Sequence, residues 1–211
     1  MMIQLDDEQW RLLKLVLSAH GGKRAMEIQS IANRQLETVE SDMLALGLID
    51  CSERLDIVRH VDFEAYSEGV RSAQFQAASF AEVEKKLWRT VVQLHSNVVA
   101  HDEIQKQSID AKTLLVRKSY AIPKTKTKLQ SNLIMKMQRV GPKAARVVVR
   151  SILDDEANPL GPESIAFDNY GWVHVEESAD GVFTYMSYMR GNFSVLKNVD
   201  MDNMVEFMSA L

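Results

Sequence analysis

The chain contains 211 residues, of which 46% are apolar and 26% are charged, and this balance is ordinary for a globular protein. Its single cysteine, Cys51, excludes a disulfide framework and a zinc site built from several cysteines. No apolar run approaches the ~20 residues that span a bilayer, and no secretion signal stands at the N-terminus, so we expect a cytoplasmic protein without membrane contact.

The net charge of −4 is unevenly distributed along the sequence. Acids outnumber bases by 18 to 12 in residues 1–110 and by 11 to 2 in residues 151–211. The segment between them, 111–150, contains 11 bases and no acid. A basic block of this length in an acidic chain indicates a surface that binds an anionic partner such as nucleic acid.

Apolar side chains recur at helical spacing through the first 46 residues. They predict three helices, at 6–19, 23–33 and 36–46. Apolar and polar residues then alternate through 55–63, which predicts a strand. Three short helices followed by a hairpin is the order of elements in a winged helix-turn-helix domain.

This part of the chain, residues 6–75, resembles bacterial winged-helix regulators of the MarR type. The resemblance rests on Gly47-Leu48-Ile49 after the third helix, on the strand at 55–63 and on Ser67-Glu68-Gly69 after the wing. It implies a DNA-binding domain whose recognition helix, at 35–42, enters the major groove.

The candidate recognition helix has Arg34 and Thr38 as its candidate DNA contacts. It also carries three acids, which the phosphate backbone of DNA would repel: Glu37, Glu40 and Asp42. The alternative is therefore a winged helix that binds a protein, as in an adaptor of a larger assembly.

A long helix is predicted at 80–98, with Ser79 as its N-cap. Its apolar residues follow a nearly heptad spacing: Phe80, Val83, Leu87, Val91, Leu94 and Val98. In MarR-like proteins the helix after the wing contributes to the dimer interface, so the resemblance implies a homodimer through 80–98. The alternative is that this stripe covers the core of its own chain.

Two further helices are predicted in the basic segment, at 129–138 and 142–153, separated by Gly141 and Pro142. On the second of them, three bases would share one face: Lys143, Arg146 and Arg150. The pair looks like a second helix-turn-helix element with a basic second helix.

We expect the basic segment to supply most of the affinity for double-stranded DNA, because Lys and Arg neutralise phosphates. Arg146 and Arg150 are the candidates for base edges, since arginine pairs bidentately with guanine. The candidate DNA contacts are Lys118, Lys124, Lys126, Lys128, Lys136, Arg139, Lys143, Arg146 and Arg150. Two alternatives are an acidic protein partner and pairing of these bases with the chain's own acids.

The last third contains a hairpin signal, because Asp180-Gly181 separates two alternating runs at 171–179 and 182–189. A two-residue turn would place Val173 opposite Tyr188 and Val175 opposite Met186. We expect a further strand at 193–199 and a final helix capped by Asp200. A second winged helix across 125–190 and a three-stranded α+β domain are alternative arrangements.

Together these patterns predict a mainly helical α+β chain in three parts. The parts are a winged helix at 1–75, a connecting helix at 76–110 and a basic and α+β region at 111–211. The predicted function is a sequence-specific DNA-binding transcriptional regulator. The five histidines are scattered and no catalytic motif is present, so we expect no enzymatic activity, no metal and no cofactor.

Overall fold

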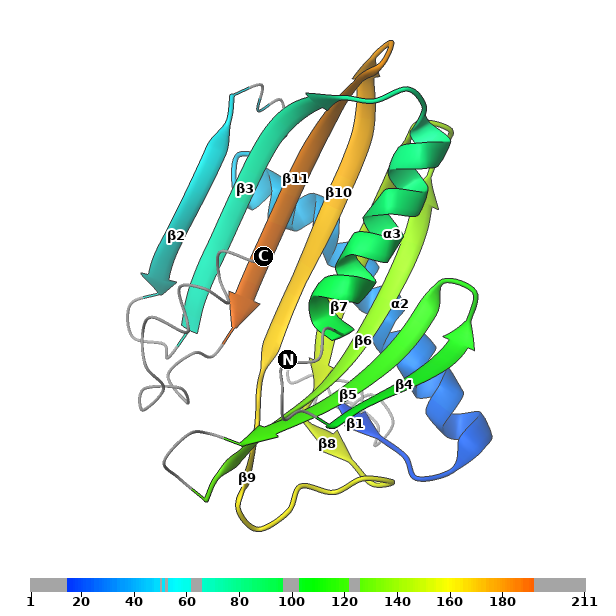
Figure 1. The fold of residues 1–211 in the computed structure, drawn as a ribbon, viewed down its shortest axis with the longest axis vertical. Helices are drawn as coiled ribbons and strands as arrows, with labels where there is room; N and C mark the ends of the chain where they lie inside the picture. Colours follow the sequence, from blue (N-terminus) through cyan, green and yellow to red (C-terminus); the bar gives the residue numbers. More distant parts are fainter. Residues whose placement is uncertain are drawn as a thin grey trace, which may run out of the picture.

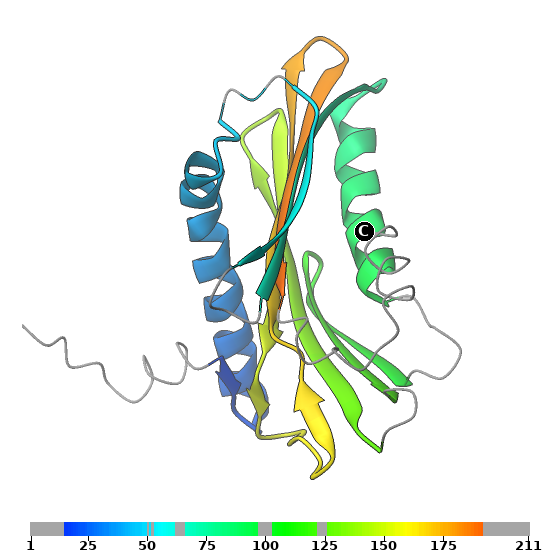
Figure 2. The same ribbon diagram turned by 90° about the vertical axis from the view of Figure 1, so that its left-hand side faces the viewer.

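A computed structural model describes residues 15–49, 51, 53–61, 66–96, 103–121 and 126–191. Strands dominate it, and a nine-stranded sheet has one helix on each of its faces (Figures 1 and 2). The elements are β1 (Val16–Leu17), α2 (Gly21–Ala45), β2 (Leu55–Val61), β3 (Tyr66–Gln76), α3 (Phe80–Ser96), β4 (Glu103–Asp110), β5 (Thr113–Ala121), β6 (Lys128–Val140), β7 (Ala144–Ile152), β8 (Asp154–Asp155), β9 (Ser164–Ala166), β10 (Asn169–Ala179) and β11 (Val182–Gly191).

The sheet has the strand order β2-β3-β11-β10-β7-β6-β5-β4, and each of these strands is antiparallel to its neighbours. β9 pairs with β6 in parallel, and β1 pairs with β8 in a separate two-stranded sheet. β3 lies beside β11, so a strand that ends at residue 76 pairs with one that begins at residue 182. Strands from all three predicted parts of the chain therefore share one sheet.

The core has two layers because both faces of the sheet are covered. On one face, α3 buries Val83, Leu87 and Val91 against strand residues such as Val147 and Phe183. On the other face, α2 packs on the same strands, and Figure 2 shows the two helices on opposite sides of the sheet. The Trp172 indole also donates a hydrogen bond to the Asp42 carboxylate at 3.0 Å, which links β10 to α2.

The prediction of a mainly helical fold is wrong, and the two helices predicted at 129–138 and 142–153 are the strands β6 and β7. Side chains alternate across a strand, so Val147 and Val149 face α3 while Val148 faces α2. Because both faces are buried, the apolar residues form a continuous run instead of an alternation. Periodicity alone does not separate such a run from a buried helix.

The winged-helix prediction is also wrong. The helices predicted at 23–33 and 36–46 are one continuous helix of 25 residues, α2, so no turn separates a recognition helix from its neighbour. Residues 1–14, which hold most of the helix predicted at 6–19, lie outside the described residues, and β1 occupies its end. The strand predicted at 55–63 is confirmed as β2, but it forms an edge of the large sheet rather than a wing.

Two local predictions are confirmed: the helix that begins at Phe80, and the hairpin at Asp180-Gly181, where Gly181 has a φ of +70°. The hairpin register differs by one residue, because a bulge between Glu177 and Ala179 places Val173 opposite Ser187. The strand predicted at 193–199 and the helix after it lie outside the described residues. Among the described helices, none is long and apolar enough to cross a membrane.

Candidate functional site: a hollow beneath helix α3

A hollow lies between the C-terminal half of α3 and the strands β2, β3, β11, β10 and β7. The hollow and the open solvent at its mouth together occupy about 690 Å³. α3 contributes Val91, Leu94 and His95 to the wall, and the sheet contributes Val149 and Val173. Most of the lining is therefore apolar, although the hollow is partly open to solvent.

Small residues on adjacent strands create the space. Gly69 of β3 lies opposite Met189 of β11, and Met189 lies opposite Gly171 of β10. A Cβ atom built on Gly69 would meet no atom within 4 Å, so the absence of a side chain there leaves room in the hollow. Replacing Gly69 with a large residue would fill that room without a clash of the Cβ atom.

Gly171 has a different role, although it lines the same hollow. A Cβ atom built on Gly171 would lie 2.5 Å from the carbonyl oxygen of Tyr188 and 3.1 Å from the Cα atom of Met189. Because both are backbone atoms, they cannot move aside without displacing β11. Gly171 therefore permits the close approach of β10 and β11 that forms the floor.

Polar groups occur at one side of the hollow. The Arg71 guanidinium and the Asp56 carboxylate form an ion pair at 3.0 Å, with the side chains 34% and 51% exposed. Ser187 lies opposite Arg71 in the β3–β11 register. The hollow thus has an apolar interior and a hydrated rim that can contact a polar group of a ligand.

His95 is the histidine of the lining, and it is only 5% exposed. Burial, together with the positive charge of Lys118, lowers the pKa of His95 to about 3. The imidazole is therefore neutral at physiological pH, so it adds no charge to the wall formed by α3.

Most of the predicted DNA contacts in the basic segment instead contact the chain's own acids or amides. Four ion pairs join them to acids from α2, α3, β10 and the residues before β10: Arg146–Glu40 at 3.4 Å, Arg150–Asp168 at 2.9 Å, Lys143–Glu177 at 3.4 Å and Arg139–Glu84 at 4.0 Å. Lys136 donates to the Gln29 and Asn33 side-chain oxygens at 2.5 and 2.6 Å. Internal pairing, one of the alternatives above, is therefore what the structure shows for these residues.

The remaining predicted contacts are dispersed. Lys118 is buried on β5, whereas Lys126 and Lys128 are exposed near the start of β6, and Lys124 lies outside the described residues. Arg34 is half-buried on α2, and the Thr38 hydroxyl donates to the Gln35 carbonyl oxygen at 3.0 Å. These side chains therefore come from α2, from β5 and from the start of β6.

The predictions of a DNA-binding regulator, of a winged-helix adaptor and of a double-stranded DNA partner are therefore wrong. They depended on helices that are strands, and on bases that pair within the chain. The predicted dimer seam on helix 80–98 is wrong for a similar reason, because Val83, Leu87 and Val91 are buried against the chain's own sheet.

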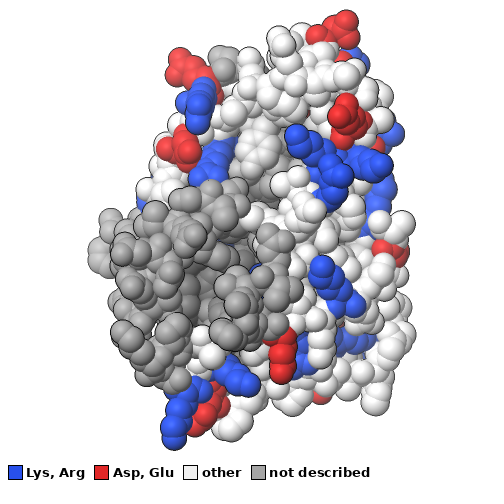
Figure 3. Space-filling model, viewed as in Figure 1, with Lys and Arg blue, Asp and Glu red and all other residues white. Residues whose placement is uncertain are grey.

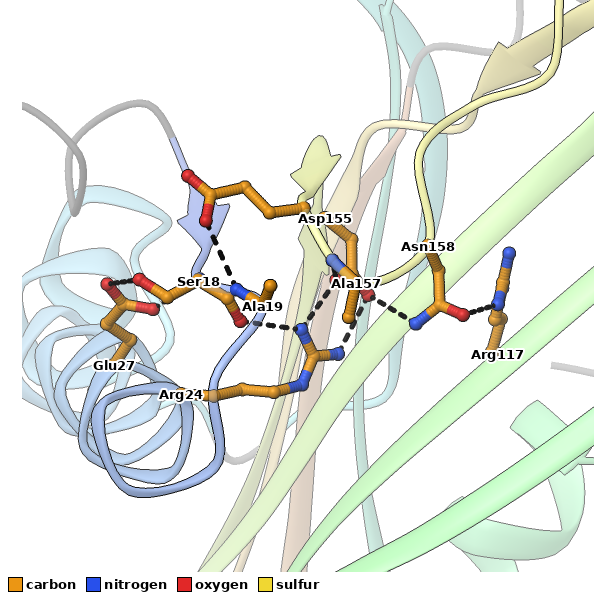
Figure 4. A network of polar contacts seen from close by, with 9 residues as sticks. Ser18, Ala19, Arg24, Glu27, Arg117, Asp155, Ala157 and Asn158 are labelled. Carbon is orange, nitrogen blue, oxygen red and sulfur yellow. Dashed lines mark hydrogen bonds and ion pairs between the residues drawn. The ribbon is translucent and has the colours of Figure 1, made fainter.

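A second polar cluster lies where α2 begins (Figure 4). The Arg24 guanidinium forms two hydrogen bonds to the Asp155 carboxylate, at 2.5 and 2.8 Å, and a third to the Ser18 carbonyl oxygen at 3.2 Å. The Ser18 amide and hydroxyl donate to the Glu27 carboxylate at 2.6 and 2.7 Å. These bonds connect Ser18, which follows β1, with α2 and β8. No group of three potential metal ligands occurs among the described residues.

Comparison with family models finds no match, and comparison with curated proteins finds none either. Among solved structures, human StAR-related lipid transfer protein 5 is 14% identical, with a TM-score of 0.48 over 86% of this chain and 95% of that chain. The STAR-related lipid transfer protein of Xanthomonas axonopodis is 20% identical, with a TM-score of 0.43 over 65% and 77% of the two chains. The lipid transfer and protein localization domain of human StarD13 is 12% identical, with a TM-score of 0.42 over 72% and 81%. At these scores the likeness assigns no family to the chain, and none of the three is named as a winged-helix regulator.

Proposed function

We propose that the chain binds a small amphipathic molecule of lipid type in the hollow between α3 and the sheet. The observation that carries this proposal is the apolar lining of the recess between α3 and the sheet. Small-molecule sites are typically concave and lined mostly by apolar side chains, with a few polar groups that fix the orientation of the ligand. An apolar ligand placed there would leave water and gain roughly 25 cal/mol for each Å² that it buries.

The position of the polar rim indicates how this ligand would be oriented in the hollow. Its apolar part would lie against Val91, Leu94 and Val173, where no charged group could be solvated. Its polar end would lie beside Arg71 and Ser187, which stay in contact with water. The ligand class that fits both regions is a molecule with one apolar chain or ring system and one polar end.

We propose binding and not catalysis, because apolar walls hold a ligand by burial and transfer no protons. We propose a reducing cytoplasm as the location. A chain with a single cysteine forms no internal disulfide bond that an oxidising compartment would maintain.

The test is displacement of a fluorescent fatty-acid probe by an unlabelled single-chain lipid, in wild type and in two variants. Gly69→Leu should fill the hollow and weaken probe binding by about tenfold or more, which corresponds to ~1.4 kcal/mol or more. Gln105→Leu adds the same side chain to the exposed strand β4 and should leave the affinity unchanged.

Urea unfolding of both variants checks that they fold. Absence of probe binding by the wild type would disprove the proposed function. Equal affinities in the wild type and in Gly69→Leu would show that the ligand binds elsewhere.

A further inference from the structure

The outer face of α3 carries three exposed bases, Lys85, Lys86 and Arg89. No described acid forms an ion pair with any of them. The nearby Glu84 carboxylate is instead shared by Lys112 and Arg139, at 3.8 and 4.0 Å. Exposed Glu82 lies one turn before Lys85 and Lys86, so three bases and one acid share this side of α3.

Figure 3 shows basic side chains gathered over the part of this face that α3 occupies. α3 contains no acid after Glu84, so its last three turns present only positive or neutral groups to solvent. The name "basic face" is used below for Lys85, Lys86 and Arg89.

The same helix forms the wall of the hollow. Val91 and Leu94 line the hollow, whereas Arg89 and Thr90 immediately before them are exposed. On a helix, positions 85 and 89 share one side, while 87 and 91 share the side that faces the sheet. The basic face and the hollow are thus the outer and inner sides of one element.

We propose that the basic face docks the chain on a bilayer surface that contains anionic lipids. This inference rests on the proposed function, because a ligand with a long apolar part is held mainly in membranes and reaches the hollow from one. Charge complementarity identifies the partner, since juxtamembrane Lys and Arg residues are attracted to anionic headgroups.

The experiment is co-sedimentation with phosphatidylcholine vesicles that contain or lack 30% phosphatidylserine. The test variant is Lys85→Glu/Lys86→Glu/Arg89→Glu, on the basic face. The matched control is Lys23→Glu/Arg54→Glu/Lys128→Glu, which changes the net charge equally through three exposed bases outside α3. Each base near an anionic surface strengthens binding by about fivefold, so the test variant should lose on the order of a hundredfold.

The wild type should bind phosphatidylserine vesicles and not pure phosphatidylcholine vesicles, and the control should lose much less than the test variant. Equal losses in the two variants would overturn the proposal. Wild-type binding to heparin but to neither vesicle would also overturn it, and would identify an acidic macromolecule as the partner.

The fluorescent probe separates this inference from the proposed function. In the absence of vesicles, the test variant should bind the probe like the wild type, because its substitutions lie outside the hollow. Loss of vesicle binding with intact probe binding supports docking. Wild-type vesicle binding without any probe binding would disprove the proposed function and, with it, the reason for docking.

Discussion

At the scale of residues, the protonation state of the buried His95 affects the charge of the wall of the hollow. It lies at the end of α3 with only 5% of its surface exposed, and the cation of Lys118 acts on it. Both effects disfavour the imidazolium and lower the pKa of His95 to about 3. Burial similarly lowers the pKa of His174 on the opposite face.

The first prediction concerns acid sensitivity. The unfolded chain protonates His95 near pH 6.5, whereas the folded chain protonates it only near pH 3. Between these values the unfolded state binds more protons, so the free energy of unfolding falls as the pH falls, by up to ~1.4 kcal/mol per pH unit from this group. His95→Leu should make that dependence shallower. Urea unfolding at pH 7, 5.5 and 4.5 measures it, and equal slopes in the variant and the wild type would contradict the buried neutral histidine.

The second prediction compares one substitution at two glycines that face α3. Gly171→Ala should destabilise the chain by about 1–3 kcal/mol, because its Cβ atom would lie 2.5 Å from the Tyr188 carbonyl oxygen. Gly69→Ala should be neutral or stabilise by up to about 1 kcal/mol, because the space there is open and the unfolded chain loses freedom. Thermal unfolding of the two variants gives the comparison. Equal midpoints would show that β10 and β11 are not packed as described.

At the scale of elements, the sequence pattern correctly predicted the elements that have one buried side and one side in contact with solvent. α3 has one buried and one solvated side, and the hairpin at Asp180-Gly181 has a strong turn signal, so both could be recognised. β6 and β7 are buried on both faces, and their apolar runs matched a helix equally well. Two features of the sequence favour strands here. One is the β-branched run at 147–149, and the other is Gly141, which forms the turn between the two strands with a φ of +70°.

The third prediction concerns the joint between α2 and β8. Arg24→Met should destabilise the chain by about 3–5 kcal/mol, because it leaves the buried Asp155 carboxylate without its charged partner. The double variant Arg24→Met/Asp155→Leu should recover part of this loss, since it removes the unpaired charge. Urea unfolding at pH 7 measures both. A double variant less stable than the single one would contradict the account of this pair.

At the scale of the whole molecule, folding mixes charges that the sequence separates. The adjacent strands β5, β6 and β7 carry many of the bases, and they lie between β10 from the acidic end and β4 from the acidic front. Arg146 therefore reaches Glu40 of α2, and Lys143 reaches Glu177 of β10. A linear count of charges indicates a DNA-binding surface only if the bases stay unpaired, and here Arg139, Lys143, Arg146 and Arg150 pair with acids of the same chain.

The hollow could not be predicted from the sequence for a related reason. Its lining comes from six elements between β2 and β11, and Gly69 and Gly171 become neighbours of Met189 only through the strand order β3-β11-β10. Each of these residues is unremarkable in its own segment. The site is a property of the topology, and the topology depends on β6 and β7, whose sequence pattern predicts helices.

Hydrogen–deuterium exchange of the wild-type chain, with and without a saturating single-chain lipid, tests the central claim most directly. We expect the lipid to slow exchange at the segments that line the hollow, 69–71, 91–95 and 185–189, and to leave the distant strands β4 and β9 unchanged. Slower exchange only outside these segments, under conditions where the lipid binds, would contradict the assignment of the hollow as the ligand site.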